Sequence, residues 1–292
     1  MTTTLTVHSA KGGAGKTTIA VNIAVILAEL FPQGKILIID FDVYSPSIHE
    51  FLPPKNGSIN HYLADFLTTE SPIQEVIYQS QEVANLYVIY SDYIKDFENA
   101  YLTDPILWTK VFWCLNNDKV RQYLLQEFTF IIYDNLPGFH LVAATALRLS
   151  DIGLLVLDVT KKYEVEGTVH LLEALYTKYV SEEDLRLFTI VNGVPPIVEP
   201  DKLEEGLRPI NDYRAMIKQK FPKAFVGSSI VVNCDCKTRS WSLQTKERNI
   251  FHQGRFKKAM MHIVRRMLIL AYPQEAKRLG ATTEELEMQQ RF

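Results

Sequence analysis

Residues 11–18 read KGGAGKTT, and they join an apolar run of strand length to a helix-like run at residues 19–30. The string has the Gly-Lys-Thr ending of a phosphate-binding loop. Its glycines let consecutive backbone N–H groups surround phosphate oxygens, and the following helix points its positive N-terminus at the same anion. A glycine-rich turn without a ligand is the alternative, but the strand-loop-helix context favours phosphate binding. The expected nucleotide contacts are Gly12, Gly13, Ala14, Gly15, Lys16, Thr17 and Thr18.

Two lysines stand in this loop, where phosphate binding by one chain needs one. Lys16 is expected to reach the β- and γ-phosphates, and the Thr17 hydroxyl to ligate Mg²⁺. Lys11 has no obvious task in a single chain that holds one nucleotide. Its presence therefore hints at charge supplied across a subunit boundary.

The loop resembles the deviant Walker A motif KGGxGKT[ST] of the ParA/MinD superfamily of P-loop ATPases. The resemblance covers about residues 4–270. It implies that Lys11 is the signature lysine, which reaches the nucleotide of the partner subunit in an ATP-sandwich homodimer. It also implies Mg²⁺-dependent hydrolysis of ATP to ADP and phosphate, with Lys11, Lys16 and Asp42 as the catalytic residues.

The bulk composition suits a cytoplasmic globular protein. The chain of 292 residues is 47% hydrophobic, and its net charge of −3 argues neither for nor against nucleic acid. Three cysteines and no recognisable secretory leader indicate a reducing compartment. The longest apolar run, residues 19–30, is too short to span a bilayer.

Apolar runs of strand length alternate with helical patterns along the chain. Such runs are typical of strands buried on both faces, so the sequence predicts a doubly wound, mostly parallel α/β sheet flanked by helices. Loops are expected at 195–196 and 206–209, and the chain divides into one P-loop ATPase domain, 1–273, and a helical tail, 274–292. The predicted strands are 5–8, 35–40, 86–90, 128–134, 152–159, 187–192 and 225–232, and the predicted helices are 16–31, 106–127, 139–149, 164–181, 209–221 and 255–272.

Acidic residues follow two of the predicted strands. Asp40 and Asp42 lie two positions apart and can face one Mg²⁺ and one water, although either alone could cap the following turn. Asp134 ends another strand and is expected to hold a water of the Mg²⁺ shell, with capping of helix 139–149 as the alternative. The resemblance assigns Asp42 to the attacking water, Asp40 and Asp134 with Thr17 to the metal, and the Gly138 backbone to the γ-phosphate.

The base of the nucleotide is expected near the end of strand 187–192. The Asn192 amide offers a donor and an acceptor to a purine edge, and the family has an Asn here that contacts adenine. A left-handed turn before Gly193 explains the residue equally well. Residues 225–236 resemble the family's base-closing loop, with Asn233 in place of the usual proline.

The cargo of the ATPase is the least determined part of the prediction. Residues 237–267 hold nine basic residues and one acid, and those expected to bind DNA without sequence preference are Lys237, Arg239, Lys257, Lys258, Arg265 and Arg266. A solvated basic face is the alternative. ParA-type relatives bind nucleoid DNA and work with an activating protein of the ParB kind, so chromosome or plasmid partitioning is the first hypothesis.

Two further hypotheses are kept. A MinD-like ATPase would position a membrane or protein assembly, but residues 275–292 are acidic and poor in bulky apolar residues, which disfavours a membrane anchor. An ATPase of the Mrp or CooC kind would carry a metal or cluster. Cys234 and Cys236 could supply thiolates, although buried or idle thiols are the default and the Mrp pattern C-x-x-C is absent.

Overall fold

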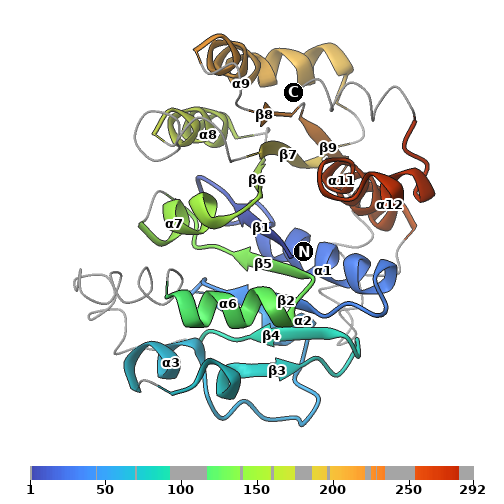
Figure 1. The fold of residues 1–292 in the computed structure, drawn as a ribbon. Helices are drawn as coiled ribbons and strands as arrows, with labels where there is room; N and C mark the ends of the chain where they lie inside the picture. Colours follow the sequence, from blue (N-terminus) through green and yellow to red (C-terminus); the bar gives the residue numbers. More distant parts are fainter. Residues whose placement is uncertain are drawn as a thin grey trace.

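The computed structural model describes residues 2–43, 45–69, 71–92, 117–138, 141–158, 161–174, 186–195, 198–220, 225–227, 229–233 and 254–282. Figure 1 shows a central sheet with helices on both of its sides. The predicted doubly wound α/β class is confirmed.

Within these residues, nine strands form one sheet in the order β3-β4-β2-β5-β1-β6-β7-β8, and β9 also pairs with β7. The pairings between these strands are parallel except for β3 with β4. Their bounds are β1 Thr3–His8, β2 Ile36–Asp40, β3 Ile77–Gln79, β4 Leu86–Ile89, β5 Phe130–Asp134, β6 Ile152–Leu157, β7 Arg186–Val194, β8 Phe225–Val226 and β9 Ile230–Asn233.

The central strands β1, β2, β5 and β6 are buried along their whole length, as their continuous apolar character predicts. Alternate side chains of each strand enter cores on opposite faces of the sheet. In β2, Ile36 and Ile38 join the core under α1 and α11, whereas Leu37 and Ile39 join the core under α3 and α6.

The helices divide between the two faces. Helices α1, α11 and α12 cover one face, and α11 packs against both of the others (Figure 1). Helices α3, α6, α7, α8 and α9 cover the other face. The bounds are α1 Lys16–Leu30, α2 Ile48–Phe51, α3 Leu63–Thr69, the 3₁₀ turn η1 Ile73–Val76, α6 Asp118–Glu127, α7 Leu141–Leu149, α8 Lys162–Ala174, α9 Pro200–Lys220, α11 Gly254–Ala271 and α12 Pro273–Arg278.

Two predicted boundaries are wrong. Residues 206–209 lie inside α9 rather than in a loop, because the helix buries Leu207, Ile210 and Ile217, and this packing outweighs the cost of Pro209 within the helix. The strand predicted at 225–232 is two short strands, β8 and β9, which each pair with β7.

Some predictions fall partly outside the described residues. These include 106–116 of one predicted helix, 175–181 of another, and 283–292 of the predicted tail. Helix α12 lies in the described part of that tail, and the division at residue 273 stays a prediction.

The order of the strands in the sheet determines where a ligand site can lie. Strand β1 lies between β5 and β6, and β2 lies on the far side of β5, so the chain reverses direction across the sheet beside β1. In open α/β sheets, ligands bind at the carboxyl ends of the strands at such a point. The carboxyl ends of β1, β2 and β5 therefore meet beside the start of α1.

Candidate nucleotide site

The loop between β1 and α1 has the backbone geometry of a phosphate cradle. Gly13 and Gly15 have φ values of 82° and 89°, which favour glycine. A Cβ on Gly15 would also lie 2.4 Å from Nδ2 of Asn192, so this position has no room for a side chain. The first turn of α1 carries no acidic residue, which leaves its N-terminus open to an anion.

The loop departs from the full phosphate-binding pattern at its first position. That pattern begins with a glycine five residues before Gly15, where this chain has Ala10. Space for the Ala10 methyl group comes from α8, because a Cβ on Gly167 would lie 3.0 Å from the Ala10 Cβ. The paired small residues keep α8 close to the loop.

Asn192 supports the loop directly. Its Nδ2 donates to the carbonyl oxygen of Ala14 at 2.8 Å. The end of β7 is thereby tied to the P-loop, a role that neither sequence interpretation of Asn192 included. The contact between Asn192 and a base stays a prediction.

The acids at the ends of β2 and β5 lie side by side, because Asp40 and Asp134 are register partners in the parallel ladder. Both are buried, at 1% and 0% exposure. Burial, and then the charge of Asp134, raises the pKa of Asp40 well above its ordinary value. Oδ1 of Asp40 accepts a hydrogen bond from the backbone N–H of Asp42 at 2.8 Å.

Among the described residues, Asp134 is one of the buried side chains that lack a hydrogen-bond partner. Its two carboxyl oxygens are buried, and neither has a hydrogen-bond partner of normal geometry among the described residues. Burial raises its pKa to about 7, although Lys16 and the nearby Thr17 hydroxyl lower it.

These residues fit a hydrated divalent cation. Buried carboxylates beside a threonine hydroxyl offer the oxygen donors that Mg²⁺ prefers, and a bound water would satisfy the oxygens of Asp134. The described residues contain no group of three His, Cys, Asp or Glu that could hold a metal by themselves. Phosphate oxygens and water molecules would therefore supply the remaining ligands of a cation here.

Lys16 and Asp42 face each other across the site. Nζ of Lys16 lies 3.9 Å from Oδ2 of Asp42, and the two side chains are 5% and 12% exposed. The backbone N–H of Ser45 donates to Oδ1 of Asp42 at 3.1 Å, so the loop after β2 orients this carboxylate. The structure thus brings the predicted lysine and water-positioning acid together.

The turn after β5 is held against the end of β1. Gly138 has a φ of 87°, and its N–H donates to the carbonyl oxygen of Ser9 at 2.9 Å. The predicted contact of this N–H with a γ-phosphate would require an exchange of partners. Ser9 also donates through its hydroxyl to the carbonyl of Lys11, at 2.6 Å. Ser9 belongs to no recognisable motif, so its role could not be predicted from the sequence.

The lysine at the outer end of the loop differs from the inner one. Lys11 is exposed, whereas Lys16 is buried. Its side chain therefore stands on the surface beside the cradle, where a second subunit could approach it. Its catalytic role stays a prediction.

The predicted DNA-binding residues are only partly described. Lys237 and Arg239, together with Cys234 and Cys236, lie outside the described residues. On α11, Lys258 is exposed and Lys257 forms an ion pair with Glu29 at 2.9 Å.

Arg266 extends the positive charge of α11 toward α9. Burial, and then the nearby charge of Arg266, lowers the pKa of Arg214 in α9. The two arginines are close enough for their charges to repel, so an anion beside them would be stabilised. Arg214 could not be predicted from the sequence, because α9 and α11 are far apart along the chain.

The comparisons with known proteins agree with this geometry. The model of the AAA domain family AAA_31 matches residues 2–186. That is more than half of the chain, and the chain belongs to this family. The resemblance to ParA/MinD-type P-loop ATPases is confirmed.

The curated relatives are similar to only part of this chain. The septum site-determining protein MinD of Buchnera aphidicola is 28% identical over 155 residues, which are 52% of this chain and 51% of that protein. The chain spans about half the length, or less, of the curated relatives that it matches.

Solved structures show the same fold. The cell division ATPase MinD of Pyrococcus furiosus matches with a TM-score of 0.64 and 20% identity, over 96% of this chain and all of that one. A plasmid partition protein of Borrelia burgdorferi matches with a TM-score of 0.58 and 21% identity, over 76% of this chain and all of that one. In the part of this chain that the structure describes, no helix has the length and apolar character needed to cross a bilayer.

Proposed function

We propose that this protein is an ATP-dependent dimerising switch, which hydrolyses ATP to ADP and phosphate and acts in DNA partitioning by binding DNA without sequence preference. The observation that carries the proposal is the convergence of Lys16, Asp40, Asp42 and Asp134 on the loop that begins with the exposed Lys11. The family match to an AAA domain supports nucleotide hydrolysis.

The described residues divide the work of hydrolysis among themselves. The backbone N–H groups of the loop and Nζ of Lys16 bind the phosphates, which draws Lys16 away from Asp42. Asp42 is then free to orient the attacking water. Thr17, Asp40 and Asp134 would hold Mg²⁺, which neutralises charge on the phosphate oxygens.

Lys11 couples ATP hydrolysis to the formation of the dimer. Its exposed position suits a cation that neutralises phosphate charge in a second subunit, as an arginine finger does, worth roughly 10³–10⁵ in rate in such enzymes. ATP would then hold two chains together, and its hydrolysis would release them. Such a cycle makes a switch rather than a metabolic catalyst.

DNA is the proposed cargo because of the charge on α11. Lys258, Arg265 and Arg266 lie on this helix, and Arg214 continues the positive region onto α9. The fold shared with a plasmid partition protein supports this choice. A protein with this role would work in the cytoplasm on the nucleoid, together with an activating protein of the ParB kind.

The dimer is tested with Lys11→Ala. We expect this variant to release no phosphate above background and to elute as a monomer with ATP and Mg²⁺, whereas the parent elutes as a dimer. Lys119→Ala, which removes an exposed lysine of α6, is the control and should behave as the parent. Unchanged ATP-induced dimerisation of Lys11→Ala disproves the role of Lys11 between subunits.

The cargo is tested by co-sedimentation of the parent protein with DNA and with liposomes, each with ATP and with ADP. Sedimentation with DNA that requires ATP supports partitioning. Sedimentation with liposomes alone would instead support a MinD-like positioning ATPase.

A further inference from the structure

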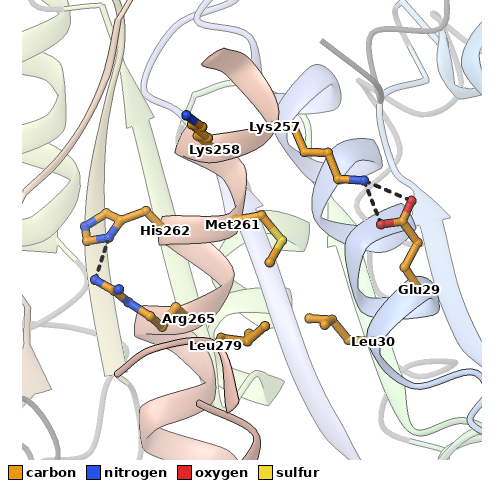
Figure 2. Close-up of a pocket in the computed structure, with 8 residues that line it drawn as sticks. All are labelled: Glu29, Leu30, Lys257, Lys258, Met261, His262, Arg265 and Leu279. Atoms are coloured by element: carbon orange, nitrogen blue, oxygen red, sulfur yellow. Dashed lines mark hydrogen bonds and ion pairs between the residues drawn. The ribbon is translucent and has the colours of Figure 1, made fainter. Parts of the chain in front are cut away.

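A groove of about 490 Å³ lies on the face of the sheet that carries α1 and α11, between the end of α1 and the outer side of α11. Figure 2 shows Leu30, Met261 and Leu279 around its apolar part. Lys257, Lys258 and Arg265 also line it. This combination suits a chain segment that is both acidic and apolar.

The charge of the groove is positive on balance. Glu29 forms an ion pair with Lys257, in which Oε2 of Glu29 lies 2.9 Å from Nζ of Lys257 (Figure 2). This acid offsets one of the three cations. Lys258 is exposed and has no acidic partner in the described part of the chain. Lys258 is therefore a cation of the groove that a further carboxylate can pair with.

The chain leads directly from this groove to residues 283–292. After α12, Leu279 forms part of the groove wall, and the N–H of Ala281 donates to the carbonyl of Ala276 at 3.0 Å. Nη1 of Arg265 lies 3.4 Å from the carbonyl oxygen of Gly280, which holds this turn against α11. Residue 283 is therefore only four positions beyond Leu279, a residue of the groove wall.

Residues 283–292 have the composition that the groove requires. They read TEELEMQQRF, with Glu284, Glu285 and Glu287 against the single cation Arg291. Their apolar side chains are Leu286, Met288 and Phe292. Ten residues can extend over about 33 Å, which is ample to cross the groove.

We propose that residues 283–292 dock in the groove between α1 and α11 of their own chain. The apolar side chains cover Leu30 and Met261, and the carboxylates face Lys258 and Arg265. A short tether places the segment at an effective concentration of about millimolar, so a weak contact is enough to fill the groove. This proposal does not rest on DNA binding, because it concerns a contact within one chain.

The position of the segment is tested by photo-crosslinking in the full chain, with p-benzoylphenylalanine in place of Met288 and mixed light and heavy isotope labels. We expect crosslinks to Leu30 or Met261 within one chain. Crosslinks that join light to heavy chains, or that avoid the groove, overturn the proposal.

A second experiment keeps the native side chains of the groove. Lysine acylation is compared between the parent and a variant with Glu284→Gln, Glu285→Gln and Glu287→Gln, with the exposed Lys119 as an internal control. We expect Lys258 to react several-fold faster in the variant, while Lys119 reacts equally in both. Equal rates at Lys258 overturn the proposal.

Discussion

Asp42 is the residue on which turnover is expected to depend. Its carboxylate lies beside Lys16 and is oriented by the backbone N–H of Ser45. We expect Asp42→Ala to lower the rate of phosphate release by roughly 10²–10⁴, the usual contribution of a positioned acid or base. Because phosphate binding does not need this side chain, the ATP-bound dimer should persist.

Phosphate release and chromatography with ATP check both parts of this prediction. Asp201→Ala, which removes an exposed acid of α9, is the control. Normal turnover in Asp42→Ala would remove Asp42 from the mechanism.

We expect Asp134 to make the stability of the protein depend on pH when no magnesium or nucleotide is added. Its pKa is about 7 in the folded chain, against about 4 in an unfolded one, so the folded state holds a proton that the unfolded state releases between these values. Its contribution to stability is therefore complete below about pH 4 and is lost as the pH rises through 7. The neutral variant Asp134→Asn avoids this loss.

Urea unfolding in magnesium-free buffer measures the effect. At pH 8 we expect a larger free energy of unfolding for Asp134→Asn than for the parent, and the difference should shrink toward pH 5. The same difference at both pH values would contradict the raised pKa.

At the scale of elements, Asn85 joins α1 to the sheet. Its Nδ2 lies 3.1, 3.0 and 2.9 Å from the carbonyl oxygens of Ala28, Phe31 and Gly34. These carbonyls lie at the end of α1 and in the turn before β2. We expect Asn85→Ala to lower the free energy of unfolding by about 1–3 kcal/mol, because partly buried carbonyl oxygens lose a donor.

Asn85→Asp should destabilise the fold further, because it turns a carboxylate toward the same carbonyls. Asn60→Ala removes an exposed amide and should change the free energy of unfolding by less than about 0.5 kcal/mol. Chemical denaturation followed by circular dichroism compares the three. Equal stabilities of Asn85→Ala and the parent would exclude this role for Asn85.

At the scale of the whole molecule, the acidic segment 283–292 and DNA are proposed to use overlapping cations. The variant with Glu284→Gln, Glu285→Gln and Glu287→Gln should therefore bind duplex DNA several-fold more tightly than the parent. Fluorescence anisotropy at one fixed salt concentration measures this, because salt alone changes such affinities strongly. Equal affinities would place the DNA surface away from the groove.

The strands and acids of the site could be predicted because their signals are local. Continuous apolar runs that end in Asp40 and Asp134 indicate buried strands whose carboxyl ends meet, and the structure places the two acids in register. The support of the loop by Asn192, and the proximity of Arg214 to Arg266, depend on contacts between distant segments. A single sequence contains no signal for such contacts. The continuation of α9 through Pro209 could not be predicted either, because it depends on the packing of the buried residues of this helix against the rest of the fold.

The N–H of Gly138 is satisfied by the carbonyl oxygen of Ser9, which directly follows the neighbouring strand β1. If this amide contacts a γ-phosphate as proposed, the phosphate has to displace a carbonyl of the same chain. A nucleotide that binds in this way would compete with the bond to Ser9, and on leaving it would not leave an unsatisfied donor behind. Such an exchange of partners would suit the proposed cycle of binding and release.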